Sequence, residues 1–221
     1  MKKIIYLVMA LALIATPSMI YAQDAATTKG DFLLDVGVGF WGGYVTGYNP
    51  GNFGDSYSWN DNGTDSHVQI PTLSLTLQKA FWDDITIGGQ FAINAYGSTH
   101  DVQQGNGYYQ HSRYTQTNMF FLGRGEYHFN RLIGWGPKYD LYAGALAGVR
   151  VSTAAQTQIY EGNSTTNPPY RTDYPDRRSG SAGPNGGVVG GIRYYFVRNT
   201  SVFAEAGVGI NFIRVGLNWR L

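Results

Sequence analysis

The chain has 221 residues, the size of one ordinary domain or one barrel. Hydrophobic residues make up 43% of it and charged residues 14%, with 17 tyrosines and 30 glycines, which favours an all-β protein over a charged helical bundle. The net charge of +1 indicates neither a nucleic-acid nor a polyacid partner, and the absence of cysteine excludes disulfides, thiol nucleophiles, thiolate metal sites and a lipid-modified N-terminal cysteine.

Residues 1–22 predict a secretory signal peptide. Lys2 and Lys3 give a positive start, residues 4–15 form an apolar run, and Ala22 ends the segment with a small residue. The run is shorter than the about 20 residues that a membrane-spanning helix needs, which argues against an N-terminal membrane anchor. We therefore expect cleavage after Ala22 and a single domain over residues 23–221.

The mature chain shows repeated alternation of apolar and polar residues with period two, which predicts β-strands. In residues 72–81, for example, Leu73, Leu75 and Leu77 share one face and Thr76 and Gln78 lie on the other. Eight such segments are present, at residues 31–41, 72–81, 84–97, 118–129, 139–151, 187–196, 201–209 and 212–221.

The predicted connections alternate in length. Residues 43–67, 99–114 and 153–185 are expected to be long loops, whereas tight or shorter connections are expected around Trp82 and Asp83, at 130–137 and at 197–200. The last connection, near Ile210, is short and breaks the pattern. Eight strands with the long loops at one end predict an all-β, antiparallel, up-and-down transmembrane barrel of the outer-membrane kind.

A soluble hollow barrel also alternates, but its apolar face points inward. Three features favour lipid on the outside instead. The apolar faces are almost free of charge, with Lys79 near a strand end as the exception; the polar faces combine glycine with charges of both signs; and aromatic residues gather at the short-turn ends of the apolar faces. These aromatics predict an interfacial girdle of Phe81, Tyr127, Phe129, Tyr194, Phe196 and Trp219.

Arg124 and Glu126 lie within the bulky apolar segment FFLGRGEYHF. An arginine on the lipid face at mid-depth would cost about 2–4 kcal/mol, so we expect both residues to face the lumen. An eight-stranded barrel is only wide enough to be filled by side chains, and an unpaired buried charge is costly. We therefore predict a charge network across the lumen made of Asp35, Arg124, Glu126, Arg193 and Glu205.

The signal peptide, the eight alternating segments and the ending SVFAEAGVGINFIRVGLNWRL resemble the small outer-membrane β-barrel proteins of the OmpA/OmpX type. The resemblance covers essentially the whole mature chain. It implies location in the outer membrane of a Gram-negative-type bacterium, with membrane lipid and the barrel-insertion machinery as partners. Many members end in phenylalanine, which resembles an address read by that machinery, whereas this chain has Leu221, two residues after Trp219.

An enzyme is not expected, since no acid, base and nucleophile converge. His111 and Ser112 are adjacent in sequence, which does not give the geometry of a catalytic triad. His128 is expected to face inward as a hydrogen-bonded lumen residue. No cofactor or metal site is predicted, because the calcium-like turn Asp61–Asp65 lacks the full ligand spacing.

The expected role is non-enzymatic: a barrel with a plugged polar lumen that is structural or binds an unidentified extracellular ligand through its tyrosine-rich loops. Two alternatives stay open at this point. One is a narrow pore for small solutes, and the other is a membrane subunit of an envelope secretion or assembly complex.

Overall fold

The computed structural model describes residues 27–40, 63–104, 108–133, 138–164 and 167–221. The predicted signal peptide, residues 1–22, lies outside the described residues, as does the first predicted long loop up to residue 62. Within the described part of the chain, no helix has the length and hydropathy of a membrane span.

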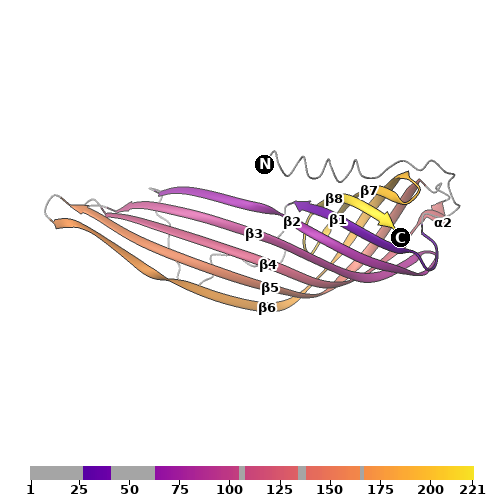
Figure 1. The fold of residues 1–221 in the computed structure, drawn as a ribbon, viewed down its shortest axis with the longest axis horizontal. Helices are drawn as coiled ribbons and strands as arrows, with labels where there is room; N and C mark the ends of the chain where they lie inside the picture. Colours follow the sequence, from indigo (N-terminus) through magenta and orange to yellow (C-terminus); the bar gives the residue numbers. More distant parts are fainter. Residues whose placement is uncertain (1–26, 41–62, 105–107, 134–137, 165–166) are drawn as a thin grey trace.

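Eight antiparallel strands close into a ring in chain order, with β1 hydrogen-bonded to both β2 and β8 (Figure 1). The strands are β1 Phe32–Phe40, β2 Gly63–Trp82, β3 Ile85–Gln104, β4 Tyr108–His128, β5 Tyr139–Ser164, β6 Asn167–Val197, β7 Thr200–Val208 and β8 Ile213–Arg220. A four-residue helix, α2 Asn130–Ile133, follows β4. The predicted eight-stranded antiparallel barrel is confirmed.

Burial along the strands follows the predicted alternation, with the polar face on the inside. On β2, Thr76 and Gln78 are buried, whereas Leu73, Leu75 and Leu77 keep about half of their surface exposed (53%, 47% and 51%). A soluble barrel would show the reverse arrangement. The exposed apolar faces instead form a belt around the barrel, which is the arrangement of a transmembrane barrel.

The prediction of long loops is wrong for most of residues 99–114 and 153–185, because these residues form β-strands. β3 continues to Gln104, β4 begins at Tyr108, and β5 and β6 extend through most of residues 153–185. These segments have polar residues on both faces, so they show none of the alternation used to recognise strands. Pairing between neighbouring strands nevertheless satisfies their backbone groups, as the continuous β3–β4 and β4–β5 registers show.

The strands are very unequal in length, and five of them continue past the barrel. β1, β7 and β8 have 9, 9 and 8 residues, whereas β5 and β6 have 26 and 31. Figure 1 shows β2–β6 running on together beyond the ends of the short strands. We call this extension the projecting sheet; it comprises residues 63–70, 95–104, 108–117, 153–164 and 167–187.

The connection between β7 and β8 is short, as predicted. Val208 ends β7 and Ile213 begins β8, with Gly209 between them at a φ of 129°. Residues with a side chain rarely adopt this backbone conformation, so a glycine suits the tight turn. This turn lies at the rim from which the projecting sheet extends.

Candidate functional site: the charged lumen

The five residues predicted for the charge network come from four different strands. Asp35 lies on β1, Arg124 and Glu126 on β4, Arg193 on β6 and Glu205 on β7, and all five are buried. Each occupies the inward phase of its strand. The structure brings all five into one connected set of contacts.

Arg124 connects opposite walls of the barrel. Its Nε donates a hydrogen bond to Oε1 of Glu126 at 2.5 Å, and its Nη1 donates to Oε1 of Gln90 at 2.9 Å. Its Nη2 pairs with Oε2 of Glu205. Because β4 and β7 are separated by two strands in the eight-stranded ring, the contact with Glu205 spans the lumen.

Arg193 forms a second centre nearer the short-turn end. Its Nη2 donates to Oε2 of Glu126 at 2.8 Å and lies 3.4 Å from Oδ2 of Asp35, and its Nη1 donates to Oδ2 of Asp140 at 3.0 Å. The guanidinium carbon lies 3.9 Å from the centre of the Tyr142 ring. Glu126 therefore joins the two arginine centres, since each of its oxygens accepts from a different arginine.

Three further ionisable residues belong to the network but were not predicted as members of it: Asp140, His128 and Arg214. Asp140 binds Arg193 and also accepts from Nδ1 of His128, at 2.8 Å. Arg214 donates to the hydroxyls of Ser74 and Thr76 at 2.8 and 2.9 Å and packs over Phe203. Asp140 and Arg214 do occupy inward phases in the sequence pattern, but phase alone does not reveal which inward charges meet.

The charges in the lumen nearly balance. Four carboxylates, those of Asp35, Glu126, Asp140 and Glu205, face three guanidinium groups, those of Arg124, Arg193 and Arg214. His128, predicted as a lumen residue, is buried between the carboxylate of Asp140 and the Thr86 hydroxyl, 3.2 Å from its Nε2. Pairing of this kind offsets the cost of removing the charges from water.

An apolar layer lies in the lumen next to the charges, on the side of the projecting sheet. On β4 the inward positions continue from Arg124 to Leu122 and Phe120, both buried. They belong to one buried cluster, whose members are Ala92, Phe120, Leu122, Leu146, Val189 and, in the β7–β8 turn, Ile210. The lumen therefore holds an ionic layer and an apolar layer in series.

A ladder of polar side chains continues from the rim into the projecting sheet. Tyr114 donates to Gln116 at 2.7 Å, Gln116 to Asn118 at 2.8 Å, Asn118 to Asn94 at 2.9 Å, and Asn94 to Thr72 at 3.2 Å. These amides satisfy one another along the inner wall.

The aromatic residues predicted for the girdle lie at the short-turn end of the barrel. Phe81, Tyr194 and Phe196 are exposed, Tyr127 packs edge-on against Phe129 at 5.0 Å, and Trp219 sits opposite Thr200 on β7. The structure adds Phe32, Trp82 and Tyr139, which are also exposed. Trp82 was not expected there; the register shift between Ala80 and Trp82 turns both Phe81 and Trp82 outward.

Lys79 is the charged residue on an apolar face. Its Nζ lies 5.3 Å from the Phe32 ring centre and 5.8 Å from the Phe81 ring centre. The stem of Lys79 thus runs along the belt and its ammonium group ends among the girdle aromatics. A lysine can occupy this position because its head reaches the interface while its stem stays in apolar surroundings.

The closed ring, the outward apolar belt and the ionic lumen decide the architecture. The chain folds into an eight-stranded antiparallel transmembrane β-barrel. It is similar to Ail, the attachment invasion locus protein of Yersinia pestis, with 10% identity over 88% of this chain and 100% of that chain and a TM-score of 0.38. It is also similar to the N-terminal β-barrel domain of Pseudomonas aeruginosa OprF, with 10% identity over 87% of this chain and 98% of that chain and a TM-score of 0.36.

At this identity and these TM-scores the two similarities carry no functional argument. No family model matches the chain, and no curated protein matches it. The architecture therefore rests on strand order, register and burial in the barrel itself.

The barrel does not bring His111 and Ser112 together as a catalytic pair. Neighbouring residues of a strand point to opposite faces, and here Ser112 is buried while His111 stays partly exposed on the other side of β4. The Nδ1 of His111 lies 2.9 Å from Oδ1 of Asp101 on the outer face of the projecting sheet. Within the residues that the structure describes, no group of three or more histidines and carboxylates could hold a metal ion.

Proposed function

We propose that the protein is a non-enzymatic integral outer-membrane barrel with a plugged lumen, which acts at the cell surface through its projecting sheet. In this proposal, residues 1–22 direct export, the barrel-insertion machinery places the chain in the outer membrane, and the short turns lie in the periplasm. Short periplasmic turns and longer outer extensions are the usual arrangement of such barrels, which supports this orientation.

The observation that carries the plugged lumen is the pair of layers inside it. The contact of Arg124 with Glu205 crosses the lumen, and the apolar cluster around Phe120 and Leu146 lies directly beyond it. A hydrated ion would have to separate buried ion pairs and then pass a dry layer. Both steps are costly in a low-dielectric interior.

Single-channel recording of the purified chain in planar bilayers tests this part. We expect no steady conductance from the wild-type barrel at neutral pH. Steady, voltage-independent conductance would contradict the plug and favour a narrow pore for small solutes.

The surface role is supported by the open edges of the projecting sheet. β6 pairs with β7 only from Val188 to Val197, and β2 pairs with β1 only from Thr72 to Lys79. In the described part of the chain, the remaining edges of β6 and β2 therefore have one paired neighbour each. An extended segment of another protein can add to such an edge through backbone hydrogen bonds.

The two edges differ in their sequence. Residues 167–187 of β6 include four prolines, Pro168, Pro169, Pro175 and Pro184, and several charged residues, which are features that protect an edge from pairing. Residues 63–70 of β2 contain no proline. The β2 edge is therefore the better acceptor for an extended surface partner.

Site-specific photo-cross-linking in the native membrane tests the β2 edge. A photoreactive amino acid at Ser66 or Val68 should give one discrete adduct, whereas the same group at Thr115, in the middle of the sheet, should give none. Proline is then placed at His67 in one variant and at Val68 in another. The adduct should be lost in the variant whose proline replaces the residue with its N–H pointing to the open edge. Adducts at Leu75 on the lipid belt, with none on β2, would instead favour a membrane subunit of an envelope complex.

A further inference from the structure

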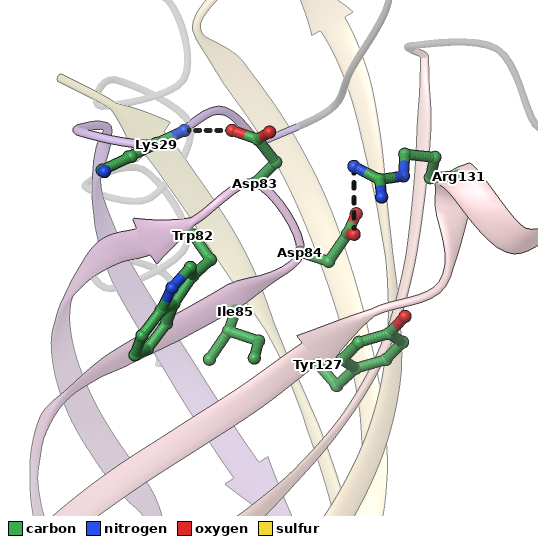
Figure 2. A pocket seen from close by; sticks show the side chains of 7 residues that line it. All are labelled: Lys29, Trp82, Asp83, Asp84, Ile85, Tyr127 and Arg131. Carbon is green, nitrogen blue, oxygen red and sulfur yellow. Dashed lines mark hydrogen bonds and ion pairs between the residues drawn. The ribbon is translucent and has the colours of Figure 1, made fainter.

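An open hollow lies at the short-turn end of the barrel, outside the lumen. Its volume is about 340 Å³, within the range of about 300–1,000 Å³ that is usual for small-molecule sites. It is bounded by Lys29 before β1, the β2–β3 turn, the end of β4, and α2 (Figure 2). No part of the lumen network contributes to it.

One side of the hollow is apolar. Trp82, Ile85 and Tyr127 line it, and Figure 2 shows them on the side away from the charged groups. Ile85 pairs directly with Tyr127 across the β3–β4 register, and Trp82 keeps 57% of its surface exposed. Trp82 and Tyr127 belong to the aromatic girdle, so this side meets the boundary between acyl chains and headgroups.

The other side carries two charges of each sign. Oδ1 of Asp83 accepts a hydrogen bond from the backbone N–H of Lys29 at 3.0 Å, which fixes the Asp83 carboxylate beside Lys29, and both residues line the hollow. Oδ2 of Asp84 lies 3.6 Å from Nη1 of Arg131, whose side chain is 75% exposed. This loose, exposed pair gains little from its own contact and can open to a ligand.

The charge pattern selects among membrane lipids. A headgroup with a phosphate and a primary ammonium group needs a cation for the first and a carboxylate for the second, next to an apolar surface for its acyl chain. Lys29 and Arg131 can supply the cations, and Asp83 and Asp84 the carboxylates. Because the two signs are equal in number, the hollow suits a zwitterionic headgroup better than an anionic one.

We propose that this hollow binds the headgroup of a phospholipid with a primary ammonium group, taken from the leaflet that faces the short turns. The phosphate lies against Arg131, the ammonium group against Asp83 and Asp84, and the first part of an acyl chain against Trp82 and Ile85. This inference rests on the orientation proposed above, but lipid binding in detergent is measured separately from conductance and cross-linking.

Native mass spectrometry of the full chain in detergent tests the site, with dioleoyl phosphatidylethanolamine and dioleoyl phosphatidylglycerol titrated in parallel. The wild-type chain should bind the ethanolamine lipid at least tenfold more tightly. Asp84→Asn should reduce this preference, and Asp83→Asn combined with Asp84→Asn should reverse it, since two cations then remain. Asp173→Asn, an exposed acid on the projecting sheet, is the matched control and should change nothing.

Two results would overturn the proposal. One is equal affinity of the wild-type chain for the two lipids, which would mean nonspecific lipid attachment. The other is full displacement of the lipid by glycerophosphoethanolamine at equal concentration, since that compound lacks acyl chains and the apolar side would then contribute nothing. If Asp83→Asn impairs folding, the preference of the single variant Asp84→Asn still decides between these outcomes.

Discussion

Arg124 is one of the two arginine centres of the lumen network, and its contacts are to Gln90, Glu126 and Glu205. Removing one partner of a buried charge pair leaves the other charge uncompensated. Replacing the arginine alone should therefore destabilise the barrel much more than replacing the arginine and its carboxylate partners together by apolar residues.

Arg124→Leu should lower the free energy of unfolding by about 3–5 kcal/mol, because Glu126 and Glu205 each lose a buried cation partner. Urea unfolding of the barrel in detergent, followed by tryptophan fluorescence, measures this loss. Arg113→Leu, at an exposed position of the same strand, is the control and should change stability by about 0.5 kcal/mol or less. Equal effects of the two substitutions would contradict the network.

Gly191→Ala tests how tightly Tyr142 is held over Arg193. A Cβ at residue 191 would lie 2.5 Å from the Tyr142 ring and hydroxyl, so the ring would have to move off the guanidinium group. We expect a loss of about 1–3 kcal/mol in the same unfolding measurement. Gly190→Ala, whose Cβ would meet its nearest atom at 3.9 Å, should be tolerated; a similar loss for both would contradict this packing.

At the scale of the elements, each long strand has two parts with different surroundings. Within the barrel, β6 has β5 on one side and β7 on the other; in the projecting sheet, described strands pair with it only on the β5 side. Local opening is easier where fewer neighbours hold a strand and water reaches both of its faces.

Hydrogen exchange by mass spectrometry should therefore divide β6 near Val188. Amides of residues 167–186 should exchange at least about tenfold faster than those of residues 189–196, which lie between two strands within the apolar belt. Uniform protection along all of β6 would mean that a further chain segment covers the projecting sheet.

The sequence pattern predicts the barrel part of each strand and misses the projecting part for one physical reason. Alternation arises where one face meets lipid and the other the lumen, as for Leu75 and Thr76. Beyond the belt both faces are polar, so residues 99–104 and 153–164 lack alternation although they pair with neighbouring strands. Loop-like composition therefore does not separate a loop from a strand in water.

The same limit applies to the site. The alternation of apolar and polar residues places Arg124, Glu126 and Arg193 on the lumen side. The pattern along one strand does not say which strands face each other across the ring. The contact between Arg193 and Asp35 joins residues 158 positions apart. Only the structure therefore shows that Asp140 and Arg214 belong to the network. It likewise shows that Trp82 lies among the girdle aromatics.

At the scale of the whole molecule, a transmembrane barrel differs from a soluble one in which side of its wall is apolar and meets lipid. Because the chain has no cysteine, single cysteines can be introduced anywhere for spin labelling without removing native ones. Labels at Leu75, Phe121 and Val149 would sample the apolar belt on three strands, and a label at Thr115 would sample the projecting sheet.

The most direct measurement is the collision accessibility of these labels in lipid vesicles, by power-saturation electron paramagnetic resonance. Our account predicts that labels at Leu75, Phe121 and Val149 collide with dissolved oxygen, which concentrates in the bilayer, and not with a water-soluble nickel complex. The label at Thr115 should show the opposite preference. Nickel accessibility at the three belt positions equal to that at Thr115 would contradict the account, because the apolar faces would then meet water.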